Sequence, residues 1–205
     1  MPAHGESSST HDTAQVISGA AVRLFHDRGY HGTSIRDIAG EAKVGIATLF
    51  HHHGSKVELL RRIMDAAFDD LLAEMEPAVA AAGDDPTARL STAVRTYVRR
   101  QCESPRENAI AASEMRSMEP PVLDELAAKR ERVHRLFASA IADGVASGTF
   151  VCDVPQETAR AVHAMCSAVS GWYRDDGPMA ADEVADLYVG MALRVVGARE
   201  LAPAG

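Results

Sequence analysis

The segment from residue 34 to residue 56, SIRDIAGEAKVGIATLFHHHGSK, constrains the fold more than any other part of the chain. Ser34 can cap a helix, and Asp37, three residues later, can complete a capping box. The apolar residues that follow lie on one helical face: Ile35, Ile38, Ala39 and Ala42. The segment therefore predicts a short buried helix, a turn at residues 43–45 and a second short helix.

The second helix, from Ile46 to about His52, has an unusual distribution of side chains. Leu49 is expected to face inward. The outward positions are Ile46, Ala47, Thr48, Phe50 and His51. A helix that contacts base edges in the major groove of DNA needs small or adaptable side chains at its N-terminal end, with hydrogen-bond donors around them. The two helices together predict a DNA-binding helix-turn-helix, and hence a regulator.

Several side chains in and beside these helices can contact DNA. Arg36 can donate to both O6 and N7 of guanine, a contact that contributes about 1–3 kcal/mol of discrimination. Lys56 is expected to begin the next helix just after Ser55, so that its ammonium and the helix end can hold a phosphate. The predicted DNA contacts are Ser34, Arg36, Lys43, Ile46, Ala47, Thr48, Phe50, His51, His52 and Lys56.

At these residues the chain resembles the TetR (tetracycline-repressor) family of bacterial transcription regulators. The resemblance rests on TSIRDIA from Thr33, on TLFHHH from Thr48, on the preceding ISGAAVRLFHDRGYHG and on the following GSKVELL, and it covers about the first third of the chain. It implies an all-α fold of about nine helices. A three-helix DNA-binding head would be followed by a helical-bundle body that binds a ligand and dimerises.

The chain also departs from the family pattern. Lys43 stands where the family has Gly, and a left-handed backbone there would cost roughly 1–2 kcal/mol, so the turn is either strained or differently bent. Gly45, Phe50 and His53 replace the usual Ser, Tyr and Phe. Ile46, where the family often has a polar residue, favours contact with a thymine methyl. The operator sequences of the family therefore do not transfer to this chain.

Composition is typical of a soluble helical protein. Of the 205 residues, 46% are hydrophobic and 5% are aromatic, and no apolar run is long enough to span a bilayer. The first ten residues are polar and lack the apolar stretch of a signal peptide, so they predict a disordered tail and a cytoplasmic location. Cys102, Cys152 and Cys166 have no close paired spacing, which predicts small buried residues rather than a disulfide framework or a zinc site.

No cofactor or metal is expected. Consecutive helical residues point about 100° apart, so His51, His52 and His53 can bring at most two rings to one ion, fewer than the roughly four ligands of a zinc site. An enzyme would need a nucleophile with its base, a metal cluster or a glycine-rich phosphate loop, and no such motif occurs at a diagnostic spacing. The sequence therefore argues against an enzyme.

Charge is divided unevenly along the chain. The formal net charge is -8, yet residues 11–62 hold seven Lys/Arg against five Asp/Glu, a net charge of +2, and six of the nine histidines. The acidic excess lies mainly in the remaining residues, which would repel DNA. This division favours one docking orientation, with the N-terminal third toward DNA.

The rest of the chain has helical periodicity and little strand pattern. A fourth helix is expected over residues 59–75, with a break near residues 77–86. Further helices are expected over residues 90–98, 110–115, 123–145, 155–173 and 181–196. The expected domains are a disordered tail over 1–10, a helix-turn-helix domain over 11–55, and a ligand-binding and dimerisation domain over 56–205.

The last two helices are expected to form a homodimer interface, because TetR relatives dimerise through them. Small residues there permit close approach of helices: Ala164, Ala168, Gly171 and Gly190. Ordinary core packing is the alternative explanation of these stripes. A symmetric dimer would present two heads to a palindromic double-stranded DNA operator.

The effector is expected to bind inside the helical bundle. The stretch SGWYRDDGPMAADEVADLY resembles a segment of TetR relatives that respond to acyl-CoA thioesters, although Ala180 stands where those have a Ser cap. The expected ligand contacts are Met115, Arg116, Met118, Leu136, Phe137, Ile141, His163, Met165, Val169 and Trp172. Flexible methionines suit an apolar ligand, and core packing is again the alternative.

The leading hypothesis is a ligand-responsive transcriptional regulator, in the family's commoner form a repressor that a small apolar or acyl-CoA-like effector releases from its operator. The alternative is an all-helical protein–protein adaptor with a degenerate DNA-binding head. The altered turn at Lys43, the altered cap at Gly45 and the missing Tyr would fit that alternative.

Overall fold

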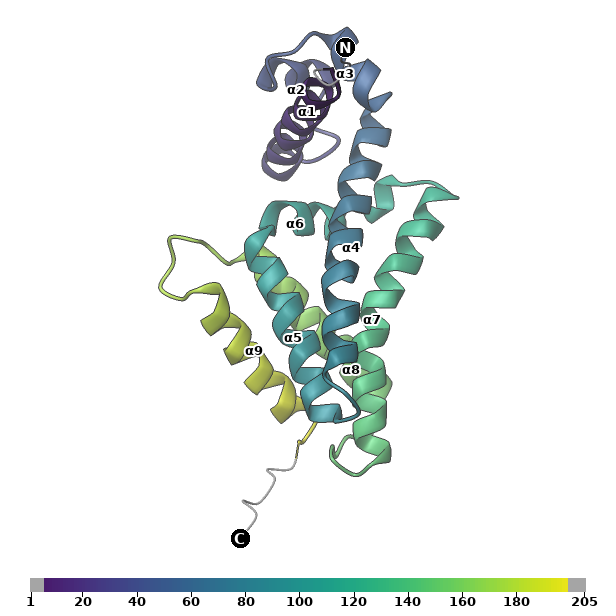
Figure 1. Cartoon of the computed structure of the whole chain (residues 1–205), viewed down its shortest axis with the longest axis vertical. Helices are drawn as coiled ribbons and strands as arrows, with labels where there is room; N and C mark the ends of the chain where they lie inside the picture. Colours follow the sequence, from purple (N-terminus) through teal and green to yellow (C-terminus); the bar gives the residue numbers. More distant parts are fainter. Residues whose placement is uncertain (1–5, 199–205) are drawn as a thin grey trace, which may run out of the picture. The chain divides into compact units, whose positions relative to one another are not determined.

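The computed structural model describes the backbone of residues 6–198 and the side chains of residues 12–198. In this range the chain is all helical, as the sequence predicted, apart from one isolated backbone bridge between Phe150 and Ala198. The α-helices drawn in Figure 1 are α1 (Glu6–Arg28), α2 (Ile35–Glu41), α3 (Ile46–His53), α4 (Lys56–Ala81), α5 (Pro86–Glu103), α6 (Pro105–Ser113), α7 (Val122–Ala146), α8 (Pro155–Ser167) and α9 (Ala181–Val195). Two short 3₁₀ helices are η1 (Glu114–Ser117) and η2 (Ala168–Gly171). None of the described helices has the length and apolarity to cross a membrane.

The described chain divides into two compact units. Unit 1 consists of the described part of residues 1–67 together with residues 106–126, and unit 2 consists of residues 68–105 together with the described part of residues 127–205. Helices α4 and α7 each contribute to both units. The functional division expected from the sequence, between residues 55 and 56, remains a prediction because compactness does not identify which segments bind DNA or ligand.

Unit 1 contains the three helices that the sequence assigned to DNA binding, α1, α2 and α3, which we call the head. α1 packs against α2 and α3 around an apolar interior. Fully or nearly fully buried members of that interior are Ile17, Phe25, Ile38 and Leu49. The capping box at the start of α2 is confirmed: Asp37 N–H donates to Ser34 Oγ at 3.2 Å, and Ser34 N–H donates to Asp37 Oδ2 at 2.8 Å. The Asp37 carboxylate accepts hydrogen bonds from the Ser34 hydroxyl, at 2.5 Å, and from the Ser34 N–H, and these two bonds lower the pKa of Asp37.

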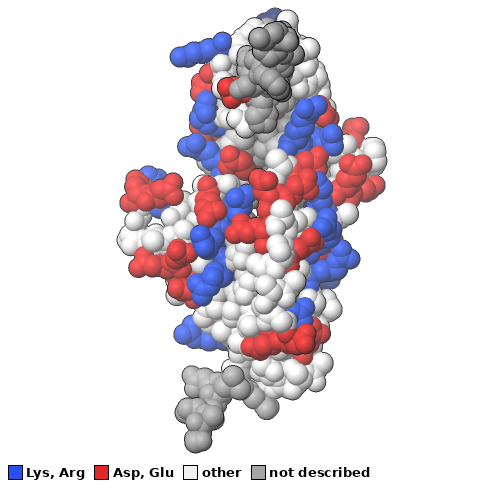
Figure 2. Space-filling model, in the orientation of Figure 1, with Lys and Arg blue, Asp and Glu red and all other residues white. Residues whose placement is uncertain are grey.

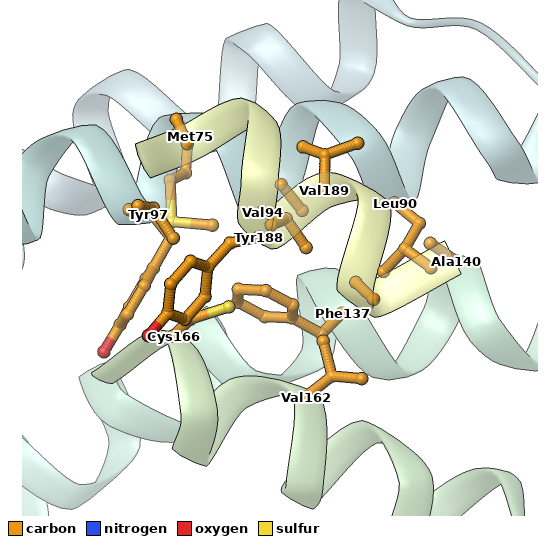
Figure 3. Close-up of a cluster of buried hydrophobic side chains, with 14 of the residues drawn as sticks. Met75, Leu90, Val94, Tyr97, Phe137, Ala140, Val162, Cys166, Tyr188 and Val189 are labelled. Atoms are coloured by element: carbon orange, nitrogen blue, oxygen red, sulfur yellow. The ribbon is translucent and has the colours of Figure 1, made fainter. Parts of the chain in front are cut away.

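Unit 2 is a helical bundle around one apolar core. α9 packs along α5, and α8 contacts both of these helices. Phe137 of α7 is fully buried and lies at the centre of the side chains drawn in Figure 3, among residues from α5, α8 and α9. On the surface, α7 is joined to α4 by ion pairs from Lys129 to Asp69 at 2.7 Å and from Arg132 to Glu76 at 2.8 Å.

The start of α1 differs from the sequence-based expectation. α1 begins at Glu6, so the predicted disordered tail is wrong for residues 6–10, while residues 1–5 lie outside the described residues. The sequence between Glu6 and Ile17 contains no Pro or Gly. Since adding a residue to an existing helix is much easier than nucleating one, the buried part of α1 can extend into this polar stretch.

The end of α4 also differs from the expectation, because the helix passes through Pro77 and ends at Ala81. Pro77 has no N–H to donate to the carbonyl of Ala73. Both residues are exposed, so water can bind that carbonyl, and on the opposite face Met75 and Val79 are buried in the core of unit 2. Packing therefore outweighs the local cost of the proline.

Candidate nucleic-acid interface and effector region

α3 buries one apolar side chain and exposes a broad face, as the sequence predicted. Leu49 is fully buried, whereas Ile46 and Phe50 are 41% and 47% exposed. The other predicted DNA contacts on this helix are exposed or half-buried: Ala47, Thr48, His51 and His52. The orientation of α3 is thus confirmed, and its contacts with DNA stay predictions.

The turn between α2 and α3 contains a residue in the left-handed region. Lys43 has a φ of 55°. Its N–H donates to the carbonyl of Gly40 at 3.2 Å, and the N–H of Val44 donates to the carbonyl of Ala39 at 3.0 Å. Of the two possibilities left by the sequence, the strained turn is therefore the one that occurs, at a cost of about 1–2 kcal/mol relative to glycine.

The ends of α3 lack side-chain caps. Gly45 occupies the N-cap with ordinary extended backbone and no side chain to accept a hydrogen bond. At the other end, Gly54 adopts a φ of 69° and its N–H donates to the carbonyl of Phe50 at 2.8 Å. Because its caps contribute little, α3 depends on tertiary packing, above all on Leu49.

Three basic residues of the head are available to an anion. The side chains of Arg28, Arg36 and Lys43 are exposed and form no hydrogen bond or ion pair with the residues that the structure describes. In contrast, Arg23 pairs with Glu41 at 3.0 Å. Arg36 could therefore bind DNA without first breaking an ion pair.

The large-scale distribution of charge is mixed. Figure 2 shows basic and acidic side chains interspersed over the visible face of the chain instead of gathered into one broad basic surface. Many are paired locally, for example Arg100 with Asp70 at 3.6 Å and with Glu74 at 3.9 Å. Long-range attraction of DNA to this face is therefore modest.

Lys56 has a structural role that the sequence did not suggest. It begins α4 directly after Ser55, as predicted. Its ammonium, however, donates to the carbonyls of Tyr30 at 3.0 Å and Thr33 at 2.9 Å, and lies 4.2 Å from the centre of the Tyr30 ring. Two of the three N–H donors of the ammonium are thus committed to the loop between α1 and α2. The contact of Lys56 with a phosphate stays a prediction. The third N–H donor of the ammonium and the start of α4 could still form it.

His53 is a buried polar residue that sequence reasoning did not assign to the core of the head. Its side chain is 3% exposed, and Nε2 donates to the carbonyl of Ala14 at 3.2 Å. Nδ1 is buried without a hydrogen-bond partner among the described residues. Burial lowers the pKa of His53 and keeps the ring neutral. The Phe that the family usually has at this position was the signal for burial.

η1 lies against the same loop that Lys56 holds, within unit 1. Ser117 Oγ is 3.4 Å from His31 Nε2 and donates to Glu114 Oε2 at 2.8 Å. Burial, together with the charge of Glu114, raises the pKa of Tyr30, next to His31. The loop between α1 and α2 is therefore in contact with both α4 and η1.

The predicted effector contacts are distributed over both units. Met115, Arg116 and Met118 belong to unit 1 and the other seven to unit 2. In unit 2, Phe137, Ile141 and Val169 are fully buried members of the core, and Leu136 and Met165 pack against it. Core packing therefore accounts for these five, and their contact with an effector remains a prediction.

His163 lies in an aromatic cluster of unit 2. Its ring stacks on Phe137 and on His134, with centroids 5.1 and 5.7 Å apart, and meets the Tyr97 ring edge-on at 5.0 Å. Burial, with help from the neighbouring His134, lowers the pKa of His163 to about 4. Tyr97 Oη is 2.8 Å from Ser167 Oγ, and burial raises the pKa of Tyr97 to about 12. Sequence reasoning missed this Tyr97–Ser167 pair because its members are 70 residues apart.

Each unit has a cavity of its own. The cavity in unit 1 has a volume of about 420 Å³ and is lined by Val57, Glu58, Arg61, Ser117, Met118, Glu119, Pro120 and Val122. The cavity in unit 2 has a volume of about 230 Å³ and is lined by Trp172, Tyr173, Arg174, Gly177, Pro178 and Met179. Each includes one predicted effector contact, Met118 or Trp172. Among the residues with described side chains, no three His, Cys, Asp or Glu residues are grouped to hold a metal ion.

Two family models match the chain. The model described as "Bacterial regulatory proteins, tetR family" matches residues 17–63, and the model described as "Tetracyclin repressor-like, C-terminal domain" matches residues 83–196. The HTH-type transcriptional repressor KstR2 of Rhodococcus jostii (strain RHA1) is 29% identical over 197 residues, which are 94% of this chain and 94% of KstR2.

Solved structures agree with these matches. The TetR family transcriptional regulator PfmR from Thermus thermophilus is 32% identical, with a TM-score of 0.78 over 87% of this chain and 97% of PfmR. AibR in complex with isovaleryl coenzyme A and operator DNA is 23% identical, with a TM-score of 0.77 over 91% of this chain and all of AibR (100%), which shows a shared fold. KstR2 and PfmR are transcriptional regulators. The chain therefore belongs to the TetR family of bacterial regulatory proteins, as a ligand-responsive transcriptional repressor that binds operator DNA, dimerises and binds a small-molecule effector.

Proposed function

We propose that this repressor binds a palindromic operator through α3 and Arg36, and that a small apolar or acyl-CoA-like effector releases it. The observation that carries the proposal is the orientation of α3, with Leu49 fully buried and the opposite face open, while Arg36 on α2 is exposed and unpaired among the described residues. A helix held from one side and exposed on the other is suited to the major groove. Arg36 would recognise guanine, and Lys43, Thr48, His51 and His52 would hold phosphates.

The proposed dimer interface lies on α8 and α9. α9 has a buried apolar face and a second apolar face at Leu187 and Val195, which are 47% and 50% exposed. On α8, the exposed positions include the small residues Ala161 and Ala164. Apolar side chains that the fold of one chain leaves exposed beside small residues support close packing against a second copy.

Acyl-CoA is the effector class that we favour. AibR binds isovaleryl coenzyme A, and the chain shares its fold. Arg116 of unit 1 and Arg130 of unit 2 are exposed and form no ion pair with described residues, so either one could bind a phosphate of a nucleotide-bearing ligand. Arg174 is less available, because it pairs with Asp176 at 2.9 Å.

Release from DNA follows from population shift. An effector that binds the DNA-incompetent dimer about 100-fold more tightly than the competent one shifts the equilibrium by about 3 kcal/mol. Within unit 1, the contact between Ser117 and His31 links η1 to the head. Met115 and Met118, two of the expected effector-binding residues, lie on either side of Ser117. The contact between Ser117 and His31 would therefore transmit a change on effector binding to the loop before α2.

The DNA-binding part of the proposal is tested by a mobility-shift titration of the promoter region of its own gene. Arg36→Ala should weaken binding by about tenfold or more, the loss of one bidentate guanine contact. Arg135→Ala is the matched control, since Arg135 is exposed but lies in unit 2, on α7. Equal affinities of the two variants would contradict the role of Arg36.

The effector part is tested with purified protein and a series of acyl-CoAs, with free coenzyme A as the control. Acyl-CoAs should raise the melting temperature and release the operator, because a ligand that binds only the folded state stabilises it by mass action. Stabilisation by unrelated apolar ligands with none by acyl-CoAs would contradict this effector class.

The adaptor alternative gains no support from the altered turn and cap. Lys43 adopts the left-handed backbone in place of glycine, and α3 begins after Gly45 without a capping side chain. The helix-turn-helix geometry forms in spite of both substitutions.

A further inference from the structure

Two large apolar side chains lie exposed on one face of α3. Ile46 and Phe50 are four positions apart, about one helical turn, and are 41% and 47% exposed. Leu49, three residues after Ile46 and on the adjoining side of the helix, is fully buried and anchors α3 to the head. Neither exposed side chain is therefore needed to hold the helix in place.

The surroundings of this apolar pair limit what it can bind. α3 contains no acidic residue, Lys43 comes three residues before Ile46 in the chain, and Arg36 lies on α2, the helix packed against α3. Both basic side chains are exposed without an ion pair to any described residue. Cations beside apolar side chains complement a polyanion that also carries apolar groups. Duplex DNA fits this description, because the C5-methyl of thymine is the apolar group on base edges in the major groove.

We propose that Ile46 and Phe50 form a methyl-binding pair that requires thymines in each half of the operator. The inference rests on the proposed function, because it names the base chemistry that α3 recognises. Ile46 is the first residue of α3, and Gly45 before it has no side chain to keep the groove at a distance. Phe50 has no hydroxyl, so it contacts DNA by its apolar ring alone.

The experiment begins with selection of an operator from random duplexes by the wild-type homodimer. Each thymine is then replaced singly by deoxyuridine, which lacks only the methyl group. Dissociation constants are measured by fluorescence anisotropy at one fixed salt concentration, because affinity for DNA depends on salt. We expect at least one position per half-site at which loss of the methyl weakens binding by about fourfold, the effect of burying one methyl-sized group.

Alanine variants then assign each methyl to its side chain. At a thymine contacted by Ile46, Ile46→Ala should bind the thymine and uracil duplexes equally, while sensitivity at positions contacted by Phe50 remains. Val151→Ala is the matched control, since Val151 is 56% exposed and apolar but lies in the loop between α7 and α8. Its affinity and uracil sensitivity should equal those of the wild type. Thermal unfolding of each variant confirms that the head is folded.

Two results would overturn the inference while leaving the repressor intact. One is a wild-type protein that binds its selected operator tightly but tolerates uracil at every position. The other is uracil sensitivity that persists undiminished in both Ile46→Ala and Phe50→Ala. Failure to select any duplex would instead overturn the proposed function, and the inference with it.

Discussion

At the scale of single residues, burial decides the chemistry of two histidines. His53 in the head and His163 in unit 2 both have a lowered pKa, with burial as the largest cause. A buried imidazolium would lose its hydration. A proton on Nδ1 of His53 would also find no hydrogen-bond acceptor among the described residues. The folded protein therefore keeps both rings neutral under conditions in which the unfolded chain would protonate them.

The pKa of His163 predicts a pH dependence of stability. Its folded value is about 4 and its ordinary value is 6.5, so the unfolded chain binds a proton that the folded chain excludes. The contribution of His163 to the free energy of unfolding is therefore complete above about pH 6.5 and is lost as the pH falls from 6.5 toward 4. Between pH 7 and pH 5, the free energy of unfolding should fall by about 2 kcal/mol through this residue.

Urea unfolding of His163→Phe at both pH values measures this effect. The variant should lose that part of the pH dependence and retain its aromatic packing on Phe137. His51→Phe, at an exposed position without an ion pair to any described residue, should keep the wild-type pH dependence. An unchanged pH profile in His163→Phe would show that other groups are responsible.

At the scale of elements, α2 and α3 illustrate two ways of stabilising a short helix. α2 begins with a complete capping box between Ser34 and Asp37. α3 has no side-chain cap and follows a turn in which Lys43 has a positive φ, so it is held by the burial of Leu49. A short helix with weak local signals is marginal alone and depends on the neighbours that position it.

The strained turn leads to a prediction about stability. Lys43→Gly should raise the free energy of unfolding by about 1 kcal/mol, because glycine adopts a positive φ without a steric penalty. Lys43→Ala removes the same charge but keeps the Cβ, so it should give no such gain. Chemical unfolding of both variants provides the comparison, and equal stabilities would contradict the strain.

At the scale of the whole molecule, exposed apolar residues form two surfaces, and each surface has a different proposed partner. Ile46 and Phe50 on α3 are assigned to DNA, and Leu187 and Val195 on α9 to a second copy of the chain. Each surface would be an unfavourable exposure in an isolated monomer, and each would become buried in the proposed assembly. The repressor is therefore best understood as one half of a symmetric dimer on DNA.

The dimer proposal predicts the effect of a charge on α9. Leu187→Glu should shift the protein from dimer to monomer, because two copies of an unpaired carboxylate would meet at the symmetric interface. Light scattering after size-exclusion chromatography measures the mass. Val16→Glu is the control, since Val16 is 52% exposed on α1 and should leave the dimer intact. A dimeric Leu187→Glu protein would move the interface away from this face.

The sequence alone determined the features that depend on nearby residues. Periodicity placed Leu49 inward and Ile46 and Phe50 outward, and the Ser34–Asp37 spacing predicted the capping box, because helical geometry relates residues three and four positions apart. The all-α fold and the helix-turn-helix followed from the same local patterns, together with the resemblance of TSIRDIA and TLFHHH to a known family.

Tertiary structure alone decided which distant groups meet. It directed the Lys56 ammonium to the carbonyls of Tyr30 and Thr33, and it joined Tyr97 to Ser167 across 70 residues. It also allowed α4 to continue past Pro77, because the burial of Met75 and Val79 on the opposite face offsets the lost backbone hydrogen bond. Local sequence specifies the direction of a side chain on its own helix, but the partner it finds depends on how the chain folds back on itself.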